Sequence, residues 1–397
     1  MKRIYLDHQA TTPLDPAVLE AMMPYLTDRF GNAGSRSHAY GWEAEEAVET
    51  ARGTIARALH ATDREIAFTS GATEAINTAL FGAAEALAEQ GRHIVTTAVE
   101  HPATLAPLRK LAERGWRVTY LPVDRDGVLD PGYLENALTT GTVLISVLHG
   151  NNEIGTLQPL TEIGRVARRH GIVLHVDAAQ AFGKVALDVN EMGIDLLSMS
   201  AHKLHGPKGV GALYVRRREA RLKLPPLLHG GGQERGLRSG TLNVPGIVGF
   251  GKAAELALVL MPEESSRLAG LRDRMARMLS EALPAVHLVG HPQLRLPTNL
   301  TLRFEGVRAD DVLLNLRGIA ASSGAACSFA SQQPSHVLRA IGLTDEQAAS
   351  TLRFGLGRFT TEDDLEEAVS RLVEVVSQLR EVSPEWARLR AAPRDGW

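Results

Sequence analysis

Three short stretches of the sequence place reactive side chains directly after apolar runs of strand length. Thr73 follows the run at residues 65–69, Asp177 follows the run at 172–176, and Lys203 follows the run at 195–200. A desolvated lysine can form a Schiff base with an aldehyde, and a buried carboxylate can pair with a cationic group. The start of a helix behind Gly71 can bind phosphate, because its first backbone N–H groups are free.

Each pattern alone also has an ordinary structural explanation. The stretch TSGATE at 69–74 fits a capping box, Asp177 fits a helix N-cap, and Lys203 fits a surface lysine in a glycine-rich turn. Together they supply a phosphate cup, an acid for a pyridinium nitrogen and an amine for an aldehyde, which are the groups that pyridoxal phosphate requires. We therefore predict a pyridoxal phosphate site of the fold-type I kind.

The elements that must position these residues follow from the hydrophobic pattern. Apolar runs at 65–69, 93–97, 143–148, 172–176, 195–200 and 210–215 are nearly continuous, which is typical of strands buried on both faces. Helical spacing at 72–90 lies between two of them. The alternation over about residues 65–215 predicts an α/β fold in which helices sandwich a mostly parallel sheet.

The pattern of apolar and charged residues changes after about residue 255. A charged helix at 263–282, a strand at 298–304, a helix near 309–317 and a helical region from about 361 predict a smaller α+β domain. We expect a large, cofactor-binding domain at residues 14–255. The small domain is expected to combine residues 1–13 with 256–397 and to carry the only cysteine.

Composition narrows the classes of function. With 43 basic and 46 acidic residues the net charge is −3, which argues against direct binding of nucleic acid. The apolar stretch at 253–261 is too short to span a membrane, and the start lacks a signal-peptide pattern, so we expect a cytoplasmic protein. The motifs of P-loop proteins and serine hydrolases do not occur.

Cys327 is the single cysteine of 397 residues, so neither an internal disulfide nor a cysteine-rich zinc site is expected. A lone cysteine is most often a buried structural residue. This one lies in SSGAACSFAS at 322–331, among small polar residues without apolar periodicity. We therefore expect a thiol on a loop, whose reactivity depends on neighbouring cations.

Motifs along nearly the whole chain resemble the cysteine desulfurases, in particular the NifS/IscS-like group with a long cysteine loop. The resemblance implies a fold-type I pyridoxal-phosphate-dependent transferase that removes sulfur from L-cysteine, releases L-alanine and leaves a persulfide on Cys327. Phe329 and Gln332-Gln333-Pro334 depart from the usual pattern after the cysteine. The motifs are YLDHQATTPLDP near the start, GNAGSRSH at 31–38, SGATEAIN at 70–77, VEHPA at 99–103, NNEIG at 151–155, HVDAAQ at 175–180, SAHKLHGPKGVGALYV at 200–215, GGGQERGLRSGT at 230–241, SSGAACS at 322–328 and LRFGLGRFT at 352–360.

The resemblance also implies roles for single residues. Lys203 would carry the cofactor and act as the base, Cys327 would accept the sulfur, and His101 would stack on the ring as an acid/base group. Arg353, helped by Asn32, would bind the substrate carboxylate. No resident metal is expected, with Cys327 at most a transient iron–sulfur ligand. The remaining cofactor contacts would be Asp177 at the ring nitrogen, Asn152 and Gln180 near the phenolic oxygen, Ala72, Thr73, Ser200 and His202 at the phosphate, and Thr241 from the other subunit of a homodimer.

The sulfur acceptor is expected to be an iron–sulfur scaffold or a tRNA-thiolation enzyme. The C-terminal end, with Trp386 and Trp397, is predicted to be a loosely held tail, and it resembles the acceptor-docking end of the family only distantly. Alternatives are a selenocysteine lyase, an aminotransferase, which needs no cysteine loop, or a non-catalytic sulfur-carrier subunit. Intact Lys203, Asp177, His101 and Cys327 argue against the last.

Overall fold

The computed structural model of the chain describes residues 2–217, 222–323 and 334–391. Its larger sheet has seven strands in the order β2-β8-β7-β6-β5-β3-β4. β8 is antiparallel to both of its neighbours, and the other pairs are parallel, so the prediction of a mostly parallel sheet is confirmed. The strands are β2 (Ile66–Thr69), β3 (His93–Thr97), β4 (Arg117–Leu121), β5 (Thr142–Leu148), β6 (Val173–Asp177), β7 (Leu196–Ser200) and β8 (Gly211–Val215).

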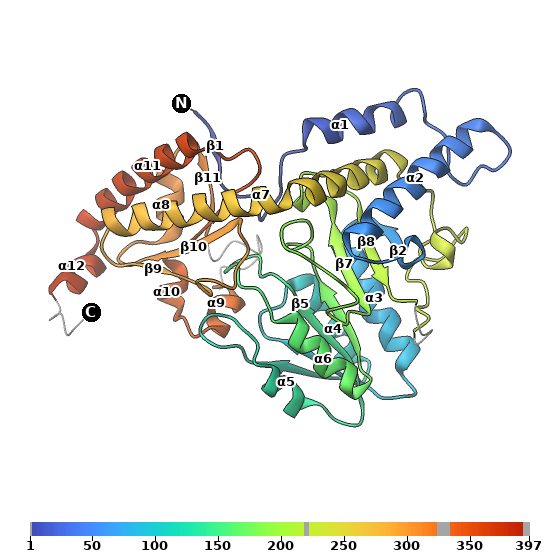
Figure 1. Cartoon of the computed structure of the whole chain (residues 1–397). Coiled ribbons are helices and arrows are strands. Elements are labelled where there is room, and N and C mark those ends of the chain that lie inside the picture. Colours follow the sequence, from blue (N-terminus) through green and yellow to red (C-terminus); the bar gives the residue numbers. More distant parts are fainter. Residues whose placement is uncertain (1, 218–221, 324–333, 392–397) are drawn as a thin grey trace.

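Helices cover both faces of this sheet (Figure 1). Successive residues of β5 show the two faces: Leu144 is buried in one hydrophobic cluster with residues of α3, and Ile145 in another with residues of α2, α6 and α7. Burial on both faces is the reason that the strands read as continuous apolar runs. The helices of this unit are α1 (Pro16–Met22), α2 (Ala39–Ala58), α3 (Ala72–Leu87), α4 (Pro102–Glu113), α5 (Pro131–Ala137), α6 (Leu160–His170) and the first half of α7 (Val244–Ala282).

A second sheet, antiparallel and four-stranded, has the order β12-β13-β10-β9 and its own hydrophobic cluster, as predicted for a smaller α+β unit. The N-terminus joins this unit, because β1 pairs with β11 in a two-stranded sheet. The elements are β1 (Ile4–Tyr5), β9 (Val286–Leu288), β10 (Asn299–Phe304), β11 (Ile319–Ala320), β12 (Ser322–Ser323), β13 (Thr351–Gly355), α8 (Ala309–Asn315), α9 (His336–Ala340), α10 (Asp345–Ala349), α11 (Glu362–Glu381) and α12 (Pro384–Ala391).

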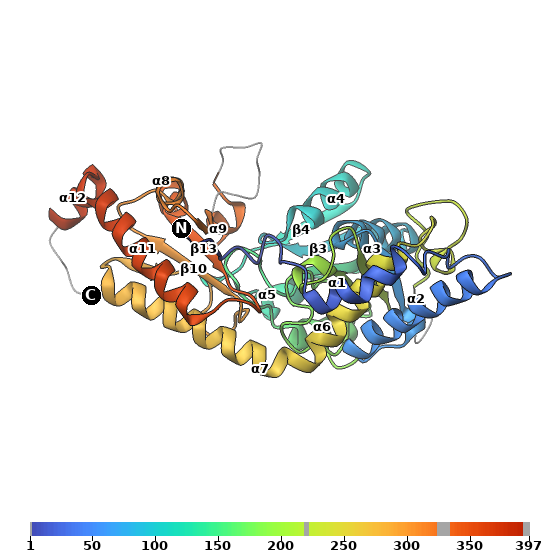
Figure 2. The same cartoon turned by 90° about the horizontal axis from the view of Figure 1, so that it is seen from above.

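One helix of 39 residues, α7, extends from the large unit into the small one and joins them (Figures 1 and 2). The predicted domain limit at residues 255 and 256 falls inside it, so the exact division stays a prediction. Within the described residues, α7 is also the helix whose length and composition would allow it to cross a membrane. Half of its most apolar window is buried in this structure, where α1 and α2 pack against it.

Two elements of the structure were not expected from the sequence. β4 is an edge strand in which Leu121 is the buried residue, so it lacks a continuous apolar run. Residues 384–391 of the predicted loosely held tail form α12, in which no residue is buried. There the guanidinium of Arg380 lies 4.0 Å from the centre of the Trp386 ring, a cation–π contact that holds the helix. Trp397 lies outside the described residues.

Candidate active site

A cavity of about 730 Å³ lies at the carboxyl ends of the parallel strands β3, β5, β6 and β7. Parallel strands end at the same edge of a sheet, and this is where ligands of open α/β sheets bind. The volume suits a cofactor with a small substrate. Most of the predicted site residues line the cavity: Ala72, Thr73, His101, Asn152, Asp177, Gln180, Ser200, His202, Lys203 and Arg353.

Lys203 ends a short 3₁₀ helix, Ala201–Lys203, that directly follows β7. Its amine donates hydrogen bonds to the backbone carbonyls of Gln9 and Ala10, the latter at 2.8 Å. The N-terminal segment thus holds the lysine at the cavity wall. Gln180 donates to the same Gln9 carbonyl at 2.9 Å, so a wall of the site depends on residues distant in sequence.

Asp177 is the last residue of β6, and only 6% of its surface is exposed. Its carboxylate accepts a hydrogen bond from the backbone N–H of Ala179 at 2.9 Å and faces the cavity. Burial raises the pKa of Asp177, and this hydrogen bond, His101 and Lys203 oppose the rise. A cationic ring nitrogen bound beside Asp177 would stabilise its carboxylate, because an opposite charge favours the ionised form.

The start of α3 has the features of a phosphate cup. Its N-cap residue, Gly71, provides no side-chain cap, and the space where a Cβ would stand is open. The first N–H groups of a 16-residue helix therefore face a cavity that the side chains of Thr73, Ser200 and His202 also line. Glu74 lies beside the cup, where it accepts from Ser70 N–H at 2.7 Å and from Arg238 at 2.8 Å.

His101 is the N-cap of α4, and its Nδ1 accepts a hydrogen bond from the backbone N–H of Ala103 at 3.1 Å. In the neutral ring the proton therefore resides on Nε2. The ring borders the open cavity, yet the protein around it lowers its pKa through desolvation, so it is neutral at neutral pH. An uncapped helix start, a buried carboxylate, a lysine and a neutral histidine around one cavity fit pyridoxal phosphate.

Arg353 reaches the cavity from β13 of the small unit and is 7% exposed. Its guanidinium donates to Asp7 at 2.8 Å, to Ser322 at 2.9 Å and to the backbone carbonyl of Asn152 at 3.0 Å. Within the described residues, its buried Nε has no hydrogen-bond partner. A cation held in a fixed orientation, with a donor to spare, is suited to bind a carboxylate.

Two predicted site residues that the structure describes, Asn32 and Thr241, do not line this cavity. Cys327 lies outside the described residues. Asn32 is exposed and bonds locally, with its side-chain oxygen accepting from Gly34 N–H at 2.8 Å. Thr241 is also exposed on the surface of its own chain.

The structure adds residues that sequence reasoning did not single out. Asp7 orients Arg353, and Gln9 supplies a carbonyl to Lys203; both belong to the N-terminal motif but contact residues far along the chain. Glu100 is fully buried beneath the site, and burial raises its pKa to about 8. Its Oε1 accepts from Thr97 at 2.6 Å and Leu148 N–H at 3.1 Å, while Oε2 has no partner among the residues that the structure describes. The sequence signal for Glu100 is weak: it is a charged residue between Val99 and His101, shortly after a buried strand.

Comparisons with known proteins agree with this geometry. The chain matches the aminotransferase class-V family over residues 4–368. It is 50% identical over 381 residues to a protein named cysteine desulfurase IscS from Anaeromyxobacter dehalogenans, covering 96% of this chain and 94% of the relative. A protein of the same name from Rickettsia felis is 49% identical over 383 residues, covering 96% and 93%.

Solved structures give the same result. A structure described as a NifS-like protein superposes with a TM-score of 0.88 at 36% identity, covering 95% of this chain and all of that one (100%). A structure described as SspA in complex with cysteine superposes with a TM-score of 0.80 at 39% identity, covering 90% and 100%.

Proposed function

Because the chain belongs to the class-V aminotransferases and, within them, to the cysteine desulfurases, we propose that it binds pyridoxal phosphate on Lys203 and passes sulfur from L-cysteine to Cys327. The observation that carries the proposal is the convergence of Lys203, Asp177, His101 and Arg353 on one cavity. The bound cofactor supplies an electron sink for the carbanion that forms next to the substrate nitrogen.

The residues of the chain divide the remaining work. Arg353 orients the substrate through its carboxylate, and Asp177 keeps the ring nitrogen protonated. The Lys203 amine would hold the cofactor and would also serve as the base that removes the α-proton of the substrate. His101, neutral with its proton on Nε2, lies where it can donate a proton to the substrate. The Cys327 thiolate attacks the substrate sulfur, so that an S–S bond forms, the Cβ–S bond breaks and its electron pair remains on carbon, which is protonated to give alanine.

The surface supports a homodimer as part of this proposal. Thr241 is exposed on its own chain. A residue that completes the phosphate site of a neighbouring subunit would have to be exposed in this way. Large apolar side chains are exposed on α1, α2 and the segment between them, and those of Phe30 and Tyr40 have ring centroids 5.5 Å apart. A second copy of this chain is the partner that would cover them. The side chains are Leu19, Met23, Leu26, Phe30, Tyr40 and Trp42.

Mixed dimers test this arrangement. Thr241→Ala and Lys203→Ala subunits, each nearly inactive alone, should regain activity when mixed, because one site of the mixed dimer then contains both native residues. The mixture should reach about a quarter of the wild-type rate if subunits exchange at random. A sedimentation experiment that finds only monomers, or a mixture without recovery, would contradict it.

We further propose that the persulfide passes to an acceptor protein, an iron–sulfur scaffold or a tRNA-thiolation enzyme, in a reducing compartment such as the cytoplasm. A single thiol that must stay free supports this location. Deleting residues 384–397 should leave alanine formation unchanged and impair sulfur delivery to the acceptor. Because Trp386 packs on Arg380, a second deletion of residues 392–397 serves as the control that keeps this contact.

The central experiment measures alanine and bound sulfur together. After one turnover with L-cysteine, mass spectrometry of the intact protein should find one additional sulfur, and peptide mapping should locate it on Cys327, the only thiol. Cys327→Ser should keep the yellow chromophore and lose both alanine and the added sulfur. Normal alanine formation by that variant would sink the proposed role of the thiol.

A further inference from the structure

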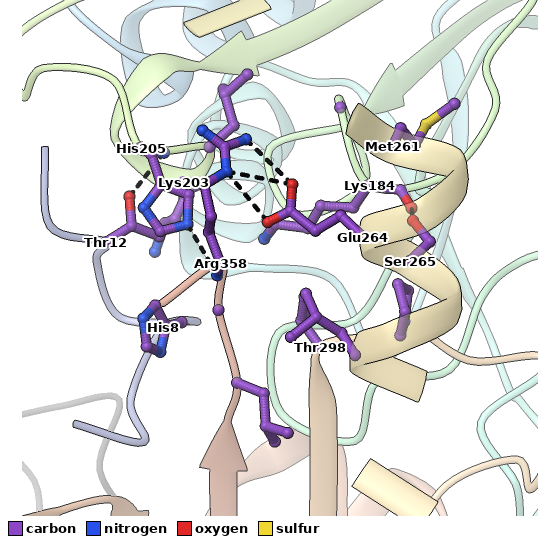
Figure 3. A pocket seen from close by; sticks show the side chains of 16 residues that line it. His8, Thr12, Lys184, Lys203, His205, Met261, Glu264, Ser265, Thr298 and Arg358 are labelled. Atoms are coloured by element: carbon purple, nitrogen blue, oxygen red, sulfur yellow. Dashed lines mark hydrogen bonds and ion pairs between the residues drawn. The ribbon is translucent and has the colours of Figure 1, made fainter. Parts of the chain in front are cut away.

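Lys184 is a second lysine beside Lys203 that the chemistry above does not use. Both side chains border a small cavity of about 30 Å³, which has room for about one water molecule. Lys203 also borders the large cofactor cavity, so it is shared by the linings of both cavities. Figure 3 shows both lysines on the wall of the small cavity, with the ion pair between Arg358 and Glu264 next to them.

A chain of hydrogen bonds connects the two lysines. The Lys184 amine donates to Gln180 Oε1 at 3.4 Å, and Gln180 Nε2 donates to the Gln9 carbonyl at 2.9 Å. The Lys203 amine donates to that same carbonyl. In this arrangement the oxygen of the Gln180 amide faces Lys184 and its nitrogen faces Gln9; protonated Lys184 selects this orientation, because an ammonium can only donate.

Several segments bring titratable or charged side chains close to the two lysines. Burial is the main cause that lowers the pKa values of His8, His202 and His205, the last two to about 4 and about 3, so these rings are neutral at neutral pH. Arg358 forms ion pairs with Glu264 and Asp15. On the cofactor side, Asp177, His101 and Lys208 face the site of Lys203.

Burial and repulsion by Lys203 lower the pKa of Lys184 to about 7, with Glu264 opposing this. Repulsion between two amines is mutual, so a proton on one opposes a proton on the other. A lysine nucleophile next to another cationic group is a recognised means of activation.

We propose that Lys184 is a positioning residue for Lys203: it orients the Gln180 amide and, in its protonated form, places a positive charge across the small cavity from Lys203, which favours the neutral, reactive form of the Lys203 nitrogen. This inference rests on Lys203 being the residue that carries pyridoxal phosphate.

The test is a pH titration of the cofactor chromophore in the full-length holoenzyme. Lys184→Met removes the charge with a side chain of similar length that tolerates burial, and the midpoint of the titration should rise by about one pH unit, a tenfold change in proton affinity. Lys184→Arg keeps the charge and should stay close to wild type. Lys110→Met, an identical change at an exposed position of α4, is the matched control and should have no effect.

A second neutral variant separates charge from hydrogen bonding. Lys184→Gln retains a donor for Gln180 and should move the midpoint as far as Lys184→Met does, with the pH profile of alanine formation moving in the same direction. Unchanged midpoints in both neutral variants would overturn the inference and leave the proposed function intact. By contrast, the absence of a chromophore in wild type, or its survival in Lys203→Ala, would remove the proposed function itself. If Lys184→Met does not fold, the Gln variant alone decides.

Discussion

Asp177, Ser200 and Lys203 reach the cavity from the carboxyl ends of neighbouring parallel strands, whereas Arg353 reaches it from the antiparallel sheet of the small unit. The first three, the sheet-edge cluster, are positioned by strands that are buried on both faces. Arg353, Asp7 and Ser322 form the junction cluster. Side-chain hydrogen bonds position it: Asp7 lies more than 300 residues before both partners in sequence, and Ser322 lies 31 residues before Arg353.

The two clusters divide the tasks of the site, which are cofactor chemistry and substrate binding. Cofactor chemistry requires groups fixed to a fraction of an ångström, and a packed sheet edge provides this. Substrate binding requires a cation whose orientation depends on contacts between the two units. Changes in the sheet-edge cluster should therefore affect the cofactor and the rate, and changes in the junction cluster should affect substrate affinity.

The largest effect is expected for Lys203→Ala. Without the amine, the cofactor cannot be held covalently and the α-proton has no base, so turnover should fall by on the order of 10⁴ and the chromophore should disappear. Absorbance spectra and alanine assays measure both. Lys110→Ala is the matched control at the surface. A Lys203→Ala protein that keeps the lysine-bound spectrum would show that the sheet edge does not hold the cofactor as proposed.

Asp177→Asn should have the next largest effect. The amide has the same shape but no charge, so the ring nitrogen is no longer kept protonated, and turnover should fall by roughly 10²–10³. The chromophore should still form, because Lys203 is intact. Stopped-flow absorbance with L-cysteine would detect the slow proton-removal step. A rate within a factor of about three of wild type would mean that Asp177 has a structural role only.

In the junction cluster, Asp7→Asn should act on binding. The amide no longer anchors the Arg353 guanidinium by a charge-assisted bond, so the KM for L-cysteine should rise roughly tenfold while kcat changes by less than about threefold. The chromophore of the substrate-free enzyme should match wild type. A large fall in kcat with unchanged KM would contradict the proposal that the junction cluster acts on substrate binding and the sheet-edge cluster on the chemical step.

The last prediction concerns the folding stability that the buried support of the sheet edge provides, and it should leave the chemistry of the site least changed. The pKa of Glu100 is raised by burial from 4.5 to about 8, so between these values the unfolded chain releases a proton that the folded chain keeps. Folding stability should therefore decrease as pH rises through this window, by up to about 1.4 kcal/mol per pH unit. Glu100→Gln lacks this titration, so it should match wild type near pH 4.5 and be more stable near pH 8. Thermal melts across this range would show it, and parallel pH curves would count against a buried neutral Glu100.

The sheet-edge cluster was the part that the sequence could predict. β3, β5, β6, β7 and β8 begin and end within a residue or two of the apolar runs, because burial on both faces leaves a continuous signal. Asp177 and Lys203 directly follow such runs, so their meeting at one edge follows from the parallel order of the strands.

The junction cluster could not be predicted in this way. Arg353 was identified only through the family resemblance, and Asp7 and Ser322 were not identified at all, since no local pattern indicates which distant segments will meet. Lys184 was missed for a related reason. Its spacing of four from Gln180 is visible in the sequence, but its proximity to Lys203 depends on how the turn after β6 packs against α7. The helix α12 in the tail could not be predicted, because it has no buried residue and its contact with α11, that of Trp386 with Arg380, leaves no apolar pattern.

The long helix α7 has a consequence for how the molecule unfolds. Its first half contributes Ile247 and Phe250 to the core of the large unit, and its second half contributes Leu271 and Met275 to the core of the small one. If either core unfolds, the half of α7 that packs on it loses its support, and this weakens the half that packs on the other core. Pro262 removes one backbone hydrogen bond between the halves, but the helix continues through it. The two units should therefore melt in one cooperative calorimetric transition. A destabilising substitution on either side of the catalytic cavity should then lower the melting temperature of the whole chain.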